Sequence, residues 1–206
     1  MRGLASARLF TALSSNGGIG LEATVSGQLL FRLGGVAEKA VLLLRDGNRV
    51  ATARPDEILE ALIGVPVDPA RLLAIVSGCV TTAEQVDRAV RHDGLLEVLT
   101  ADGTAYLAAA GSGWQARAGR FGASAGASEV VVDYGRFVGG LPRDIRIASS
   151  SAGKAAVSLN LRVQAVQTNV DLDPAVFRVT IPDGATTISL EELRQTGPLA
   201  EDATSR

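Results

Sequence analysis

Residues 40–53 read AVLLLRDGNRVATA, a stretch that contains the basic unit of the fold. One apolar run, residues 40–44, and a second, residues 50–53, stand on either side of Asp46-Gly47. Asp-Gly between two strand-forming runs is the strongest short-range signal for a β-hairpin. The stretch therefore predicts two antiparallel strands joined by a tight turn.

The same pattern recurs along the chain. Residues 95–108, LLEVLTADGTAYLA, are two apolar runs around Asp102-Gly103, and residues 157–165, VSLNLRVQA, alternate apolar with polar side chains. Alternation with period two is typical of a strand that has one face in water. We also expect strands at residues 114–118, 129–133, 144–148 and 177–181. The fold class is therefore mainly β with a few short helices, and we expect residues 177–181 to complete an antiparallel sheet beside residues 157–165.

Two short amphipathic helices are predicted near the middle of the chain. Residues 55–63 and 68–77 each carry an apolar stripe, and each stripe is followed by a stop, Gly64 or Gly78. Asp68 is placed to cap the second helix. Helices this short must lie on an apolar surface, because isolated helices of this length are marginal in water.

Two further helical segments have weaker signals. Residues 81–92 are predicted to form a third helix, with Thr82 and Gln85 as its capping box. Ser189 is predicted to cap a last helical segment over residues 190–195. Both predictions rest on caps more than on an apolar stripe.

Size and composition limit the class of protein. With 206 residues, 47% of them hydrophobic, the chain is long enough to bury a core. We expect a single domain over residues 1–199, followed by a disordered tail, residues 200–206. The formal net charge of −2 gives no basic patch for a nucleic acid or an anionic membrane surface. The first ten residues have no apolar core of a signal peptide, so we expect any leader to lie outside this chain.

Residues with catalytic potential are few. His92 is the only histidine, so a histidine-based metal cluster is excluded, and it precedes Asp93-Gly94, which favours a solvated turn. The stretch SNGGIG, residues 15–20, lacks the glycine spacing and the lysine of a phosphate-binding loop. We therefore expect no enzyme activity, no catalytic residues, no cofactor and no metal.

Cys79 is the only cysteine, which excludes an internal disulfide. The residues Val76-Ser77-Gly78-Cys79 match the lipidation box of bacterial lipoproteins, but that box closes a short N-terminal signal, whereas here a long patterned stretch comes first. The interpretation we favour is a helix C-terminus at Gly78 followed by a small buried thiol.

The order of these segments resembles the LolA/LolB superfamily of bacterial outer-membrane lipoprotein carriers and receptors, in particular its LolB-like branch. The matching pieces are IGLEATVSGQLLFRL, AVLLLRDGNRV, PDEILEALIGVPVDPARLLAIVSGC, YGRFVGGLPRDIRI and the closing LNLRVQAVQTNVDLDPAVFRVTIPDGATTISLEELRQTGPL. The resemblance implies an unclosed antiparallel β half-barrel with an α-helical lid. It also implies a place in the periplasm or on the periplasmic face of the outer membrane, as a soluble carrier or as an anchored receptor.

The function implied by this resemblance is binding of lipoprotein acyl chains, or of a related lipid, between the concave sheet and the lid. Other lipoprotein-sorting proteins are further candidate partners. Burial of each CH₂ group in an apolar pocket would contribute roughly 0.8 kcal/mol. The predicted cavity residues are Leu29, Phe31, Leu33, Val41, Leu43, Ile58, Leu62, Leu72, Ile75 and Val76. The alternative for every one of them is ordinary core packing.

Two other functions stay open. The chain is alternatively a non-catalytic structural or protein-interaction module of the envelope, which would hold its partner at a sheet edge or at the helices. A hydrolase that uses His92 ranks third, because no G-x-S-x-G motif accompanies that histidine.

Overall fold

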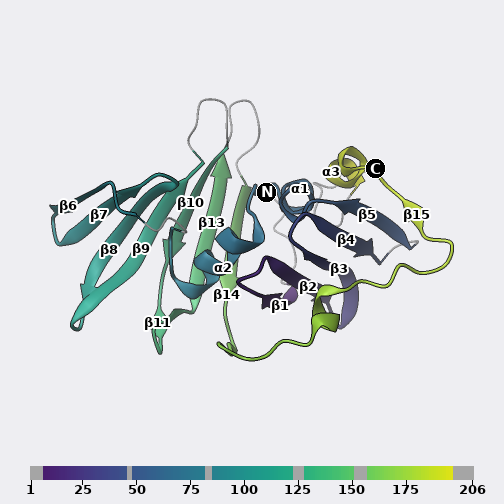
Figure 1. Ribbon diagram of the computed structural model, residues 1–206, viewed down its shortest axis with the longest axis horizontal. Helices are drawn as coiled ribbons and strands as arrows, with labels where there is room; N and C mark the ends of the chain where they lie inside the picture. The colour runs from purple at the N-terminus through teal and green to yellow at the C-terminus, as the bar shows by residue number, and fades with distance from the viewer. Residues whose placement is uncertain (1–6, 46–47, 82–84, 123–127, 151–156, 197–206) are drawn as a thin grey trace. The chain divides into compact units, whose positions relative to one another are not determined.

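A computed structural model describes residues 7–45, 48–81, 85–122, 128–150 and 157–196. This part of the chain is mainly β, with open, largely antiparallel sheets and short helices, which confirms the predicted class (Figure 1). The chain divides into two compact units. Unit 1 comprises residues 1–69 and 170–206, and unit 2 comprises residues 70–169.

Unit 2 is thus inserted into the sequence of unit 1. The prediction of one domain over residues 1–199 is not decided by this division, because two compact units can fold together or separately. The predicted tail, residues 200–206, lies outside the described residues. Each unit is described by itself below.

The sheet of unit 1 is an antiparallel meander whose last edge receives one short parallel strand. In spatial order its strands are β1 (Arg8–Leu13), β2 (Gly18–Val25), β3 (Gln28–Val36), β4 (Lys39–Leu44), β5 (Arg49–Ala53) and β15 (Thr186–Thr187). Pairing of β4 with β5 confirms the hairpin predicted for residues 40–53; its Asp46-Gly47 turn lies outside the described residues.

Register separates the two faces of this sheet. Leu21 pairs with Leu33, and Leu33 pairs with Leu42, so these side chains share one face, which we call the helix face. Helix α1 (Pro55–Ile63) packs against β4 and β5, and α3 (Leu190–Thr196) packs against α1 (Figure 1). The most deeply buried side chains of unit 1 gather here, Leu33, Leu42, Ile58 and Leu59 among them, and they form its core.

Both helices of unit 1 begin and end close to the predicted residues. Gly64 ends α1 in the left-handed conformation, with φ of 71°, and its N–H donates to the carbonyl of Glu60. Ser189 Oγ accepts a hydrogen bond from the N–H of Glu192 at 3.1 Å, so the predicted serine cap of α3 is confirmed.

The predicted strand over residues 177–181 is wrong. Residues 170–185, here called the strap, contain a 3₁₀ turn, η1 (Pro174–Phe177), and otherwise no regular structure. Asp173 caps that turn by accepting from the N–H of Ala175 at 2.8 Å. Phe177 and Val179 alternate with polar residues because both lie against the sheet of unit 1, not because the strap pairs as a strand. Period two thus reports one-sided burial here without strand pairing.

Unit 2 contains a seven-stranded antiparallel sheet in the described residues. In spatial order its strands are β14 (Val157–Arg162), β13 (Asp144–Ser150), β10 (Glu129–Tyr134), β9 (Gly113–Phe121), β8 (Gly103–Ala110), β7 (Leu95–Thr100) and β6 (Arg88–His92). The predicted strands at residues 114–118, 129–133, 144–148 and 157–165 are confirmed in this sheet, as is the hairpin predicted for residues 95–108. A two-stranded ribbon, β11 (Phe137–Val138) with β12 (Leu141–Pro142), accompanies it.

The helix predicted over residues 81–92 is wrong in the described part, because residues 88–92 form β6. Asp93 and Gly94 have φ of 45° and 84°, the geometry of a tight hairpin turn, and this turn pairs β6 with β7. Strand pairing across the turn therefore prevails over a helix that had caps but little apolar stripe.

Helix α2 (Pro69–Ser77) contacts the sheet of unit 2 through a hydrogen bond from Tyr134 of β10 and an ion pair with Asp102 of the β7–β8 turn. Its predicted stop is confirmed: Gly78 has φ of 81°, and the N–H of Cys79 donates to the carbonyl of Ala74 at 2.8 Å. After the helix, Val80 rests directly over Gly119 of β9, where a Cβ would collide with it. Val80 therefore packs closely against β9, on the chain that follows α2.

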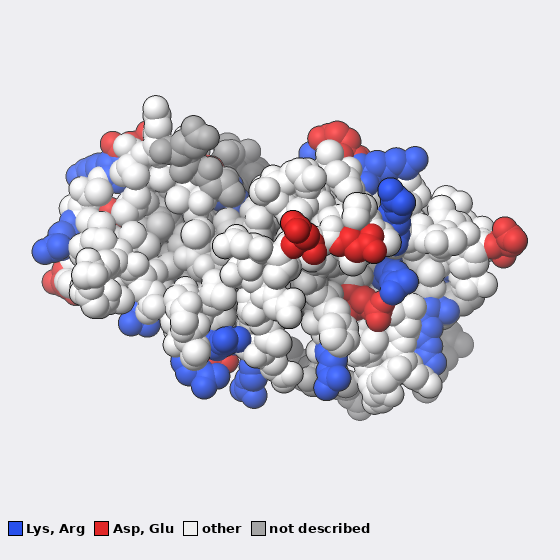
Figure 2. Space-filling view, turned by 60° about the horizontal axis from the view of Figure 1, so that its bottom comes forward, with Lys and Arg blue, Asp and Glu red and all other residues white. Residues whose placement is uncertain are grey.

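Charged side chains are scattered over the face shown in Figure 2, with both signs interspersed, in keeping with the net charge of −2. None of the helices in the described part of the chain is both long and apolar enough to cross a membrane.

Candidate functional site

The candidate site is an open groove on the second face of the unit 1 sheet, which we call the strap face. It has a volume of about 480 Å³ and lies between the β3–β4 hairpin and the strap. Its lining residues are Gly34, Gly35, Val36, Lys39, Val41, Phe177, Arg178, Val179 and Thr180. Volumes of about 300–1,000 Å³ are usual for small-molecule sites.

A stripe of glycines lets the strap approach the sheet. Gly20 and Gly34 are paired neighbours on β2 and β3, so both face the strap. A Cβ at Gly34 would lie 2.9 Å from the carbonyl oxygen of Phe177, and one at Gly20 would collide with the carbonyl oxygen of Val176. The strap therefore rests on the backbone of these strands.

The groove begins where the glycine stripe ends. Val41 of β4 pairs with Gly34, so it continues the same row with a full side chain. Val36 and Lys39 pair across the two-residue turn of the β3–β4 hairpin and lie on the same face as Val41. Beyond the glycines, these side chains form one wall of the groove, and Phe177 and Val179 of the strap form the other.

Two cations line this apolar groove, Lys39 and Arg178. Glu38, the acidic neighbour of Lys39, lies 3.7 Å from the guanidinium of Arg54 instead. Among the described residues neither Lys39 nor Arg178 forms an ion pair, and no Asp or Glu lines the groove. The groove is therefore apolar in its walls and positive in its charge.

The ten predicted cavity residues do not come together on one surface. Phe31 and Leu33 lie on the helix face, whereas Val41 and Leu43 lie on the strap face. Leu29 is out of line with Phe31, because an irregularity in the β2–β3 pairing places it opposite Thr24. The two-residue turn of the β3–β4 hairpin is the reason, because it pairs Leu33 with Leu42 and thus places even-numbered β4 residues opposite odd-numbered β3 residues. Of the ten residues, Val41 lines the groove.

The five predicted lid residues divide between the units. Ile58 and Leu62 are buried on α1 in unit 1, and Ile75 is buried on α2 in unit 2, where Leu72 and Val76 are half-buried. Burial of this degree agrees with the core-packing alternative. Their assignment to a lipid cavity stays a prediction.

Sequence reasoning missed Lys39, Arg178 and the strap residues of the groove. The signals available in the sequence are the glycines of residues 17–20 and 34–35. A stripe of glycines on paired strands indicates close approach of another backbone. Sequence alone does not say which segment approaches, because the strap is more than 130 residues away from these strands.

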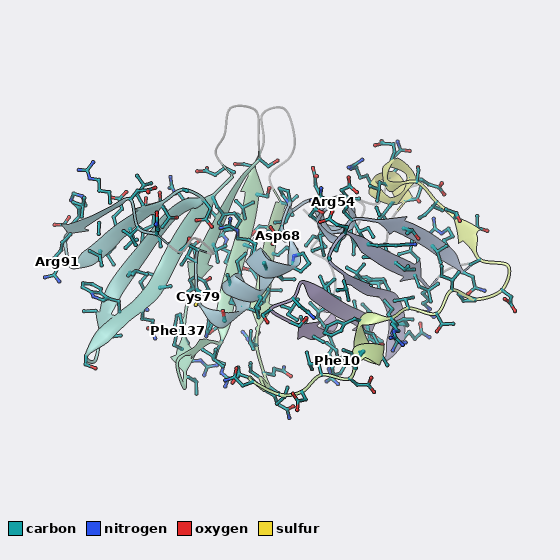
Figure 3. All side chains as sticks on the ribbon, viewed as in Figure 1. Phe10, Arg54, Asp68, Cys79, Arg91 and Phe137 are labelled. Atoms are coloured by element: carbon teal, nitrogen blue, oxygen red, sulfur yellow. The ribbon has the colours of Figure 1, made fainter. Side chains whose placement is uncertain are left out.

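His92 and Cys79 lie outside the groove, in unit 2. His92 is exposed at the end of β6, with its Nε2 3.8 Å from Glu97 Oε2, as expected for a solvated turn. Cys79 is exposed, so the predicted buried thiol is wrong: the turn after Gly78 carries it past the end of α2 (Figure 3). Burial, and secondarily the nearby Cys79, raises the pKa of Tyr134 far above its usual value, and Tyr134 donates to the carbonyl of Ile75 at 3.0 Å.

A half-buried polar cluster holds α2 to the β7–β8 turn. Arg71 Nη1 lies 3.0 Å from Asp102 Oδ2, and its guanidinium stacks over the ring of Phe121 at 4.6 Å. Thr81 and Thr100 each donate to Asp102 Oδ1 at 2.6 Å. The cluster has a structural role, because every group in it is engaged by another.

Within the described residues, no group of three or more His, Cys, Asp or Glu side chains is arranged to hold a metal ion. Comparison with family models, with curated proteins and with solved structures gave no match. The resemblance to the LolA/LolB superfamily therefore stays a prediction.

Proposed function

We propose that this protein is a non-catalytic lipid-binding protein and that the groove on the strap face of unit 1 holds an acyl chain. The observation that carries the proposal is the open groove walled by Val36, Val41, Phe177 and Val179. Its apolar side chains are partly exposed, and Val36 is 46% exposed. An acyl chain would cover these side chains, at roughly 0.8 kcal/mol for each CH₂ group buried.

This proposal moves the ligand away from the predicted interior. In the half-barrel hypothesis, the acyl chains lie between the concave sheet and a helical lid, against Phe31, Leu33 and Ile58. Those side chains are at most 5% exposed and are already packed. An acyl chain would have to displace them, at the cost of repacking a close-packed core, whereas the groove is open. A lipid-carrying role in the bacterial envelope, as the LolA/LolB resemblance suggests, is compatible with either location.

Native mass spectrometry of gently purified protein, followed by titration with a fluorescent fatty acid, tests the proposal. Val36→Asp is expected to weaken binding at least tenfold, because a charge in the apolar wall must be desolvated. Val138→Asp is the matched control, since Val138 is also a strand valine next to a turn and is 48% exposed, but lies in unit 2. Equal binding by both variants, or no acyl ligand bound by the wild type, contradicts the proposal.

A second candidate function is protein interaction through β1. This strand is at one end of the sheet order of unit 1, and it exposes Leu9 by 43% and Phe10 by 58%. An edge strand with exposed apolar residues is a template for pairing with another chain. If this is the function, Phe10→Asp abolishes capture of a partner while fatty-acid binding is unchanged.

A further inference from the structure

The charge of the groove is unbalanced. Its nine lining residues include Lys39 and Arg178 and no carboxylate. The acidic residue next to Lys39 in sequence and the one on the neighbouring strand β2 each have another partner. Glu38 pairs with Arg54, and Glu22 accepts from Arg32 Nη2 at 2.6 Å.

Lys39 and Arg178 each belong to a segment of the backbone that is held in place beside the apolar side chains of the groove. Lys39 is the first residue of β4 and pairs with Val36, so it follows a tight turn. Arg178 stands in the strap between Phe177 and Val179, both of which lie against the glycine stripe. The N–H of Arg178 also donates to the carbonyl of Ala175 at 3.1 Å, which closes the 3₁₀ turn. Both cations thus line one groove, Lys39 from the sheet and Arg178 from the strap.

We infer that the ligand of this groove is a single-chain amphiphile with a carboxylate head group, which Lys39 and Arg178 bind while the chain lies along the valines. The inference rests on the proposed function. Guanidinium matches a carboxylate through two parallel hydrogen bonds, and lysine adds a point charge. A carboxylate is favoured over a phosphate because no helix N-terminus, the usual phosphate site, contributes to the lining residues. One chain suits a groove of about 480 Å³ better than the several chains of a lipoprotein.

Decanoate, decanol and decyl phosphate, each below its aggregation concentration, distinguish the possibilities by calorimetric titration of the full chain. Decanoate is expected to bind at least about tenfold more tightly than decanol, since a hydrogen bond to a charged group contributes that much or more. Its advantage is expected to shrink with added salt, because exposed charges are screened.

The double variant Lys39→Ala/Arg178→Ala is expected to lose the preference for decanoate over decanol. Arg88→Ala/Arg117→Ala, which removes two exposed arginines of unit 2, serves as the charge-matched control and is expected to keep the preference. Circular dichroism and the unfolding midpoint of each variant confirm that its fold is intact.

Each outcome is decisive. Equal affinity of the wild type for decanoate and decanol overturns the carboxylate inference and leaves the proposed function standing. Tighter binding of decyl phosphate than of decanoate overturns the choice of head group. A preference for decanoate that survives in Lys39→Ala/Arg178→Ala overturns the assignment of these two residues. Binding of none of the three ligands overturns the proposed function itself.

Discussion

The two units are built from the same kind of meandering sheet but are covered differently. In unit 2, α2 is sealed to its sheet by Val80 over Gly119, by the Arg71–Asp102 pair and by the hydrogen bond of Tyr134. In unit 1, α1 covers one face, while the other face is covered by a strap that makes few backbone hydrogen bonds. The groove of unit 1 lies beside the strap, which has no regular structure apart from one 3₁₀ turn. The groove of unit 1 therefore lies where a sheet face is covered by chain without regular structure.

The largest expected effect is on amide protection, and it follows from the number of chain segments in each unit. Unit 1 consists of two segments that are separated in sequence by unit 2, whereas unit 2 is one continuous segment. Unfolding of unit 2 would leave unit 1 to close a loop of roughly 100 residues, which costs up to about 4 kcal/mol. Ile147→Ala in the core of unit 2 is expected to cost about 2–5 kcal/mol and to lower amide protection in both units.

Hydrogen exchange followed by mass spectrometry is the measurement for this asymmetry. Leu33→Ala, the counterpart in the core of unit 1, is expected to lower protection in β3 and β4 and to leave β9 and β10 close to the wild-type level. Equal loss of protection in both units from either substitution would show one cooperative domain, as predicted from the sequence over residues 1–199.

The polar cluster of unit 2 gives the next effect in size. Asp102→Ala removes the acceptor of two threonine hydroxyls and the partner of Arg71, and it is expected to cost about 1.5–3 kcal/mol. Asp133→Ala, on the exposed side of β10, is the control and is expected to change the free energy of unfolding by less than about 0.5 kcal/mol. Urea denaturation measures both. Equal effects would remove the structural role assigned to the cluster.

Close approach of the strap to the glycine stripe predicts a smaller effect in unit 1. Gly34→Ala places a methyl group against the carbonyl of Phe177 and is expected to cost about 1–3 kcal/mol and to displace the strap. Gly113→Ala is the control, because no atom lies within 4 Å of a Cβ at that position. A thermal melt of each variant, together with proteolysis at Arg178, reports on the strap. An unchanged cleavage rate in Gly34→Ala would mean that the glycine stripe does not hold it.

The smallest expected effect is on the free energy of unfolding of a Tyr134 variant, and it depends on pH. The pKa of Tyr134 is raised in the folded protein, so the unfolded chain loses the phenolic proton first, near pH 10. The contribution of Tyr134 is therefore complete below pH 10 and is lost as the pH rises above it, by up to about 1.4 kcal/mol per pH unit. Tyr134→Phe is expected to be about 1 kcal/mol less stable than the wild type at pH 8 because it loses the hydrogen bond to Ile75.

Above pH 10 this difference is expected to shrink and then reverse. Urea denaturation of both proteins between pH 8 and pH 11.5 gives the two stability curves. Parallel curves over the whole range would contradict the raised pKa.

Local signals in the sequence predicted most of the elements. Asp-Gly turns, period-two patterning and helix stops act over a few residues, so the two hairpins, the strands of unit 2 and helices α1 and α2 follow from the sequence. The same local signals gave wrong predictions at residues 177–181 and 81–92, where tertiary packing or strand pairing decides the structure. Phe177 and Val179 alternate because they lie on glycines, and the caps of residues 81–92 were outweighed by a hairpin.

The candidate site was predicted less well. Register fixes which side chains share a face, and a one-residue difference moves a side chain to the opposite face. Val41 was therefore grouped with Leu33 although the β3–β4 turn places them on opposite faces. Lys39 and Arg178 are distant in sequence, so no local pattern joins them; only the return of the strap to unit 1 does.

The central claim is that the ligand lies in the groove and not between a sheet and its helix. Isotope-filtered NOE spectroscopy of the protein with ¹³C-labelled decanoate tests it directly, with methyl groups as the reporters. The account predicts NOEs from the chain of decanoate to the methyl groups of Val36, Val41 and Val179. NOEs to Leu33 and Ile58 in the core of unit 1, with none to the three valines, would contradict it.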